Sequence, residues 1–164
     1  MVLKNDTKMK KLTFLFTLFV FVVMAGCTSD PVKDDVVKYS NSIAPIMASS
    51  DAIAKKSDES GKETDPKALV NKFRKELLPM ITELKTKLEA IKPTTKEVQD
   101  IHAAYLIGIR DFETGIKGLA DAVEKHDQKL AKASTDKISA IGPIEEKFKK
   151  DFNELATKHN VKLQ

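Results

Sequence analysis

The chain has 164 residues, a formal net charge of +4 and a single cysteine. One cysteine excludes an intrachain disulfide, and the length suits one domain with its own apolar core. The chain lacks Trp and has only two Tyr and two Arg. This composition argues against the aromatic platforms and arginine clusters that bind nucleic acid, so no nucleic-acid partner is expected.

The first predicted element is an export signal that starts at Met9. Lys10 and Lys11 supply a short positive segment, and an uncharged, mostly apolar run of 14 residues follows over residues 12–25. A membrane-spanning helix needs roughly 18–20 apolar residues, whereas a positive start and a run of about 7–15 apolar residues are typical of a secretory signal. We therefore predict that residues 1–26 are a cleaved signal peptide, with Met9 as the true start.

The signal ends in Met24, Ala25, Gly26 and Cys27, which resemble the lipobox of bacterial lipoproteins. That pattern is an aliphatic residue, then small residues, then cysteine, and Met24 stands where leucine is usual. The resemblance implies a diacylglycerol on the Cys27 sulfur and cleavage before Cys27 by the prolipoprotein processing enzymes. It also allows an acyl chain on the new amine. The alternative is an ordinary cleaved signal that leaves Cys27 as a free thiol.

Two or three acyl chains would hold the protein firmly on a membrane, because each buried CH₂ contributes about 0.8 kcal/mol. Four lysines and Asp6 leave with the signal, so 24 basic and 23 acidic residues remain over residues 27–164. The mature net charge of about +1 gives no support for an anionic polymer as partner. Residues 27–30 form a short lipidated tether, so the folded domain is expected close to the bilayer.

Apolar residues recur at helical spacing through the rest of the chain. The pattern is clearest where Val98, Ile101 and Tyr105 begin a stripe with spacings of three and four residues. Helices are predicted over residues 31–56, 66–91, 95–125 and 128–159. Long helices with mostly short connections favour an all-α, up-down-up-down four-helix bundle over residues 31–164.

The predicted helix ends carry recognisable signals. Asp30-Pro31 and Asp65-Pro66 each combine an N-cap with proline at the first helical position. Thr94 and Glu97 have the spacing of a capping box for the third helix. Asn160 is predicted to be a left-handed C-cap for the fourth helix.

Three of the predicted helices have a proline near the middle, namely Pro45, Pro79 and Pro143. An interior proline removes one backbone hydrogen bond and kinks the helix, which frees the carbonyl four residues earlier. In one interpretation these kinks bow the helices around a shared core. In the other they surround a mid-bundle cavity for a small ligand or a metal ion. The candidate residues for this cavity are Asp111, Tyr105, Met47, Met80 and His102.

Small residues form a second stripe along the third predicted helix, at Ala104, Gly108, Gly115 and Gly118. Glycine inside a helix costs about 1 kcal/mol relative to alanine, so the stripe needs a physical reason. Close approach of a neighbouring helix is one reason. An exposed groove or a dimer contact for a partner is the other.

The sequence offers no recognisable catalytic or metal motif. His102, His126 and His159 are not spaced three or four residues apart, and no zinc, calcium-loop or nucleotide-binding pattern occurs. His102 is expected to be a partly buried, hydrogen-bonded residue of the third helix. No nucleophile, base and orienting group converge in the pattern, so no enzymatic activity and no bound metal are expected.

These patterns predict a membrane-anchored cell-envelope lipoprotein that acts as a non-enzymatic interaction or structural module, with an unidentified envelope protein as partner. The alternative is a small-ligand or metal-ion binding protein that uses the mid-bundle cavity. We expect the protein on the extracytoplasmic face of the cell membrane in a Gram-positive cell. In a Gram-negative cell, Thr28 supplies no Asp-type retention signal after Cys27, so the outer membrane would be expected.

Overall fold

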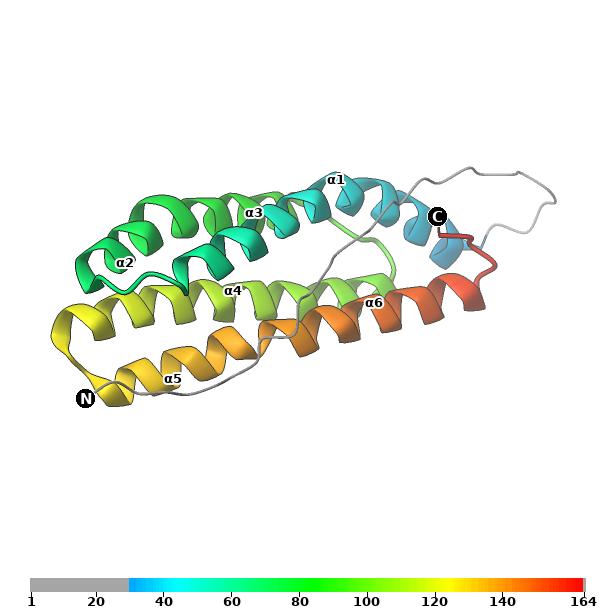
Figure 1. Ribbon diagram of the computed structural model, residues 1–164. Helices are drawn as coiled ribbons and strands as arrows, with labels where there is room; N and C mark the ends of the chain where they lie inside the picture. Colours follow the sequence, from blue (N-terminus) through cyan, green and yellow to red (C-terminus); the bar gives the residue numbers. More distant parts are fainter. Residues whose placement is uncertain (1–29, 164) are drawn as a thin grey trace.

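The computed structural model describes residues 30–163, and these residues form a helical bundle without strands (Figure 1). The predicted helical bundle is therefore confirmed, while the predicted signal peptide, lipobox and Cys27 lie outside the described residues. The helices are α1 (Pro31–Ser60), α2 (Pro66–Lys72), the π-helical segment η1 (Phe73–Leu77), α3 (Leu78–Ala90), α4 (Lys96–Lys125), α5 (Gln128–Ser139) and α6 (Ile141–Lys158).

These segments form four rods, because α2, η1 and α3 follow one another along one rod and α5 and α6 along another. Figure 1 shows the rods side by side, with the chain reversing its direction at residues 61–65, 91–95 and 126–127. Helix α4 packs against each of the other three rods. It is therefore the central element of the fold.

The predicted caps of the first two helices are confirmed. Asp30 Oδ1 accepts the N–H groups of Val32 and Lys33 at 3.1 and 3.2 Å. Asp65 Oδ1 accepts the N–H of Lys67 at 3.0 Å. Each carboxylate satisfies N–H groups that the first turn of a helix leaves without an intrahelical partner.

Two residues with a left-handed backbone lie at the C-terminal ends of α4 and α6. Asn160 has the predicted left-handed conformation, with φ of 54°, and it lies one residue after His159, which is the C-cap of α6. His126 has φ of 53° and ends α4. The chain then turns into α5, where Asp127 Oδ1 accepts the N–H of Leu130 at 2.9 Å.

The predicted capping box of Thr94 and Glu97 is wrong. Thr95 is the N-cap of α4, and its side chain makes no capping hydrogen bond. Asp35 of α1 supplies the acceptor from another helix, since its Oδ2 accepts the N–H groups of Thr94 and Thr95 at 2.9 and 2.7 Å. Hydrogen bonds to Asp35 on another helix therefore replace the predicted local capping box.

The three interior prolines affect their helices differently. Helix α1 continues for 30 residues through Pro45. Before Pro79 the chain forms η1, in which the Leu78 N–H donates to the Phe73 carbonyl five residues back. Pro143 follows the break at Ala140 that separates α5 from α6. A proline has no N–H to offer, so two of the three predicted helices change their hydrogen bonding near it.

The core is filled by aliphatic and aromatic side chains from all four rods. Tyr105 of α4 stacks on Phe148 of α6 with ring centroids 4.5 Å apart, and Tyr39 of α1 lies 5.4 Å from Phe152. Pairs of this kind add about 0.5–1.5 kcal/mol each beyond their burial. These aromatic contacts join α1, α4 and α6 in the half of the bundle where α1 begins.

Helix α4 approaches α5 and α6 through glycines. A Cβ built on Gly108 would lie 2.6 Å from Ile144 Cγ2, and one on Gly115 would lie 3.0 Å from the carbonyl oxygen of Ser134. A Cβ on Gly118 would meet the Ser134 hydroxyl. The close helix contact explains these three glycines, because any larger side chain would push the helices apart.

We expect Gly115→Ala to lower the free energy of unfolding by about 1–3 kcal/mol, because the added methyl group meets the α5 backbone, which has little freedom to move. Gly61→Ala is the matched control. Gly61 has φ of −64°, and a Cβ at this position would meet only ordinary contacts at 3.6 and 3.7 Å. This control should be neutral or stabilise by up to about 1 kcal/mol. Urea unfolding followed by circular dichroism measures both, and equal midpoints for the two variants would contradict the close contact.

Candidate functional site

Two of the predicted cavity residues meet inside the bundle. Tyr105 is 1% exposed and Met47 is 3% exposed, and the Tyr105 hydroxyl donates to Met47 Sδ at 3.7 Å. Burial raises the pKa of Tyr105, and the nearby carboxylate of Glu145 raises it further. The Tyr105 hydroxyl therefore stays protonated and acts as a hydrogen-bond donor between α4 and α1.

Asp111 does not join them, and its predicted place in the cavity is wrong. Its side chain is 45% exposed and forms an ion pair with Lys137 of α5. The inward positions of this part of α4 are Ile109 and Phe112, which are almost fully buried. Asp111 therefore lies at the edge of the α4–α5 contact, where its carboxylate reaches water and a cation.

Met80 also lies away from the Tyr105 hydroxyl. It lines an open groove between α1 and α3, together with Ala48 and Ala52 of α1. Its thioether is therefore part of the outer seam between two helices.

His102 lies in the core and makes a hydrogen bond, as predicted for this residue of the third helix. It is 8% exposed, and its Nδ1 lies 3.1 Å from the hydroxyl of Tyr39 on α1. Burial lowers the pKa of His102, and the positive charge of Lys92 lowers it further. The neutral ring therefore serves as a hydrogen-bond partner between α1 and α4.

The small-residue stripe is not an open groove. Ile144, Ser134 and Ile138 occupy the space beside Gly108, Gly115 and Gly118. A dimer contact through these three glycines would have to displace α5 and α6. Ala104 lies beyond the contact, and its side chain is exposed.

The pattern did not single out two polar residues near Tyr105. Ser50 of α1 is 7% exposed, and its hydroxyl makes no close hydrogen bond within residues 30–163. A weak hydrogen bond between Ser50 and the Tyr105 hydroxyl lowers the pKa of Tyr105, against the larger effect of burial. Glu145 of α6 is half-buried, and burial raises its pKa, as does the charge of Asp51, while Lys149 opposes them. The signal for Glu145 was its place among Ile141, Ile144 and Phe148, a stripe of apolar residues at helical spacing.

The end of the bundle where α1 begins holds two further carboxylates. Asp35 is 3% exposed, and its Oδ2 also accepts the Thr95 hydroxyl at 2.7 Å. Burial tends to raise the pKa of Asp35, but the hydrogen bonds from Thr95 and Thr94 outweigh it and lower the pKa below its ordinary value. The signal was an acidic residue between Val32 and Tyr39 on the inward face of α1.

Asp30 joins the two ends of the described chain. Its Oδ1 caps α1, and its Oδ2 lies 2.6 Å from Nδ1 of His159, which follows α6. The contact with His159 and the α1 N–H groups lower the pKa of Asp30, against a smaller effect of burial. The last residue of the predicted tether thus contacts both α1 and the residue that follows α6.

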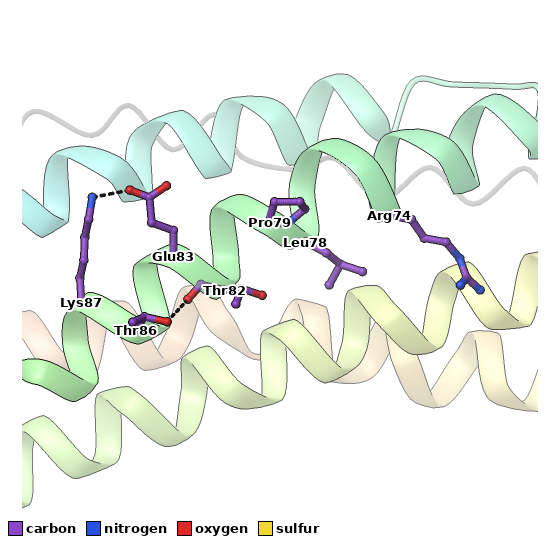
Figure 2. A pocket seen from close by; sticks show the side chains of 7 residues that line it. All are labelled: Arg74, Leu78, Pro79, Thr82, Glu83, Thr86 and Lys87. Carbon is purple, nitrogen blue, oxygen red and sulfur yellow. Dashed lines mark hydrogen bonds and ion pairs between the residues drawn. The ribbon is translucent and has the colours of Figure 1, made fainter.

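Figure 2 shows an open groove along α3, lined by Arg74, Leu78, Pro79, Thr82, Glu83, Thr86 and Lys87. Its polar side chains are bound to other groups of the bundle. Glu83 pairs with Lys87 at 2.6 Å, Thr86 donates to the Thr82 carbonyl, and Arg74 turns away to Asp121 at 2.7 Å. The groove therefore presents an apolar surface without convergent polar groups.

Residues 30–163 contain no grouping of three or more His, Cys, Asp or Glu side chains that could hold a metal ion. Within the same range, no helix is both long enough and apolar enough to cross a membrane.

The described residues thus define a helical bundle with an apolar core, a few internal hydrogen bonds and one end at which Asp30 and His159 are held together. The profile of the EMYY-motif containing lipoproteins matches residues 9–162, so the chain belongs to this family. The matched range includes the residues of the predicted lipobox as well as nearly all of the bundle. The sequence contains no Glu-Met-Tyr-Tyr tetrapeptide. No curated protein and no solved structure matches the chain.

Membership in this family confirms the predicted resemblance to bacterial lipoproteins and implies a membrane-anchored protein outside the cytoplasm. Residues 24–27 lie within the matched range but outside the described structure.

Asp35→Ala should lower the free energy of unfolding at neutral pH by about 2–3 kcal/mol, because two N–H groups and a hydroxyl lose a charged acceptor. The matched control is Asp34→Ala, an exposed neighbour on the same turn, with an expected change within about 0.5 kcal/mol.

The pKa of Asp35 is lower in the folded chain, so its contribution is complete above the unfolded value of about 3.9 and is lost as the pH falls through the folded value. As the pH is lowered below about 4, the free energy of unfolding should therefore fall less in Asp35→Ala than in the parent. Urea unfolding between pH 2 and pH 7 tests this, and parallel pH profiles would contradict it.

Proposed function

We propose that this lipoprotein is attached to the membrane through Cys27 and acts as a non-enzymatic interaction module of the cell envelope. The observation that carries the proposal is the position of Asp30. It caps α1 and binds His159, and it lies only three residues after Cys27. A lipid on Cys27 would therefore hold the folded bundle close to the membrane, with only residues 28 and 29 between Cys27 and Asp30.

The placement of polar groups supports a role without catalysis. Tyr39 with His102 and Tyr105 with Met47 use their polar atoms for contacts between helices. Such contacts fix the arrangement of the bundle and leave its outer surface to meet other molecules.

The far end of the bundle is the proposed contact region. In the predicted up-down-up-down order, residues 61–65 and 126–127 lie away from the anchor. A protein partner in the envelope would meet these connections first. We place the protein on the outer face of the cytoplasmic membrane of a Gram-positive cell, with the prolipoprotein processing enzymes as its transient partners.

Replacement of Cys27 by Ala should abolish lipid attachment and release the protein from the membrane fraction. Mass spectrometry of the parent protein should find an acylated N-terminal peptide that begins at Cys27. Ser29→Ala, two residues further on, serves as the control and should remain acylated. If Cys27→Ala is cleaved and membrane-bound like the parent, the lipobox assignment is wrong.

The Ser50 hydroxyl favours a second candidate function, the binding of a small polar ligand between α1, α4 and α6. Ser50 lies one turn after Met47 on α1, and its weak hydrogen bond to Tyr105 lowers the pKa of that residue. A buried hydroxyl without a close hydrogen bond costs free energy, which a bound ligand would recover. Half-buried Glu145 would supply the charge in place of the excluded Asp111.

A thermal-shift screen of small ligands and metal ions tests this candidate. A ligand of this site should raise the melting temperature of the parent, and Ser50→Ala should abolish the shift. Without ligand, Ser50→Ala should melt near the parent temperature, because the lost hydroxyl makes only a weak hydrogen bond to Tyr105. Ser49→Ala is the neighbouring control. If no ligand shifts the parent, or if Ser50→Ala keeps the shift, the second candidate fails.

A further inference from the structure

A groove of about 470 Å³ lies between the first turns of α1 and the connection from α3 to α4. Its apolar lining includes Ile46 and Ile91, and the buried ring of Tyr39 also contributes. Three lysines from three different elements line it as well: Lys38 from α1, Lys87 from α3 and Lys92 from the connection. An apolar floor surrounded by ammonium groups suits a ligand with a negative head and an apolar body.

The charges in the lining are unbalanced. Among the described residues that line the groove, Asp35 is the only acidic one, and its Oδ2 accepts three hydrogen bonds from Thr94 and Thr95. That carboxylate is committed to the start of α4. Lys87 pairs with Glu83, but these side chains are 47% and 67% exposed, and exposed ion pairs exchange partners at little cost.

Lys92 is close to the inner wall of the groove. Its ammonium group donates to the Glu89 carbonyl at 2.7 Å, and its charge lowers the pKa of the buried His102. His102 in turn contacts the Tyr39 hydroxyl. An anion bound beside Lys92 would offset the charge of that lysine and so raise the pKa of His102. The titration of His102 would therefore report on anion binding.

The groove also lies near the anchor. Asp30 is three residues from Cys27, at most about 10 Å along an extended chain. Lys38 is a further eight residues along α1, or about 12 Å of helix. Figure 1 shows the α3–α4 connection at the end of the bundle where α1 begins. If the bundle leans toward its α1–α3 side, the lysines reach the lipid headgroups.

We propose that this groove binds the phosphate of an anionic phospholipid headgroup in the bilayer that carries the anchor. Lys38 and Lys92 hold the phosphate, Lys87 completes the positive rim, and Ile46 and Ile91 contact the glycerol region. The bundle therefore leans with its α1–α3 side toward the membrane. This inference rests on the proposed lipid attachment at Cys27.

The test uses the full lipoprotein, purified from membranes and reconstituted into two kinds of vesicle. One kind contains about 30% phosphatidylglycerol in phosphatidylcholine, and the other contains phosphatidylcholine alone. Amine-reactive labelling followed by mass spectrometry gives a rate for each lysine. The labelling rates at Lys38 and Lys92 should be at least fivefold lower in phosphatidylglycerol vesicles than in phosphatidylcholine vesicles. The reason is that each lysine near an anionic surface contributes about a fivefold gain in binding to that surface. Lys67 and Lys129, exposed at the far end, should not change.

Two variants complete the design. In Lys38→Gln/Lys92→Gln the protection of Lys87 should disappear, whereas in Lys67→Gln/Lys129→Gln it should persist. The imidazole signal of His102 should titrate at a higher pH in phosphatidylglycerol vesicles than in phosphatidylcholine vesicles. All four lysines are exposed, so both variants should unfold at the parent temperature.

Equal labelling in the two vesicles would overturn the proposal. If inorganic phosphate at about 10 mM protects Lys38 and Lys92 equally well in phosphatidylcholine vesicles, the groove takes a soluble anion and the lipid assignment is wrong. Failure of the lipoprotein to sediment with either vesicle would instead contradict the attachment at Cys27. A protein that sediments without lysine protection contradicts only the groove.

Discussion

The carboxylate of Asp35 ties the start of α4 to α1, and the geometry of the anchor end depends on this contact. One oxygen, Oδ2, accepts two N–H groups and one hydroxyl from residues 94 and 95, all within 2.9 Å. The desolvation of a buried carboxylate is costly, and only such charge-assisted hydrogen bonds offset it. The same contact holds the α3–α4 connection beside α1. It also commits the acidic group of the groove to the start of α4, which leaves Lys38, Lys87 and Lys92 as the other charged residues of the lining.

A different constraint controls the other side of α4. Gly108 and Gly115 let α6 and α5 approach so closely that Ile144 and the α5 backbone occupy the space of a side chain. Glycine lowers helix propensity, so this contact must return more packing energy than the helix loses. The prolines have a different effect from the glycines. The glycines lie within the continuous helix α4, whereas the chain interrupts its regular α-helical hydrogen bonding near Pro79 and Pro143. Central helix α4 has no proline, and it is also the helix that all the other rods contact.

The sequence predicted the helices well because their signals are local. Asp30-Pro31, Asp65-Pro66 and Asn160 act within a few residues, and the structure confirms each of them. The errors concern contacts between helices. Thr94 and Glu97 had the spacing of a capping box, yet a carboxylate 59 residues away took the Thr94 N–H. Asp111 and Glu145 both lie near apolar stripes, and only the packing of α5 and α6 decides which of them reaches water. Periodicity identifies a face of a helix, but it does not identify its neighbour.

A lipid on one residue fixes a distance from the membrane but not an orientation, because a single tether leaves the bundle free to tilt and rotate. Asp30 removes part of this freedom, since it joins α1 to His159 and so makes the last residue of the predicted tether part of the folded domain. A second contact with the bilayer is still needed to define which side faces outward. Residues 27–164 carry a net charge of about +1, so their overall charge cannot supply that contact. Three lysines that line one apolar groove can supply it. The electrostatic field of an anionic membrane decays within about 10 Å, so it acts on the charges that lie nearest the membrane and not on the net charge of the whole domain. The orientation in which partners meet this lipoprotein would then depend on a few side chains near the anchor.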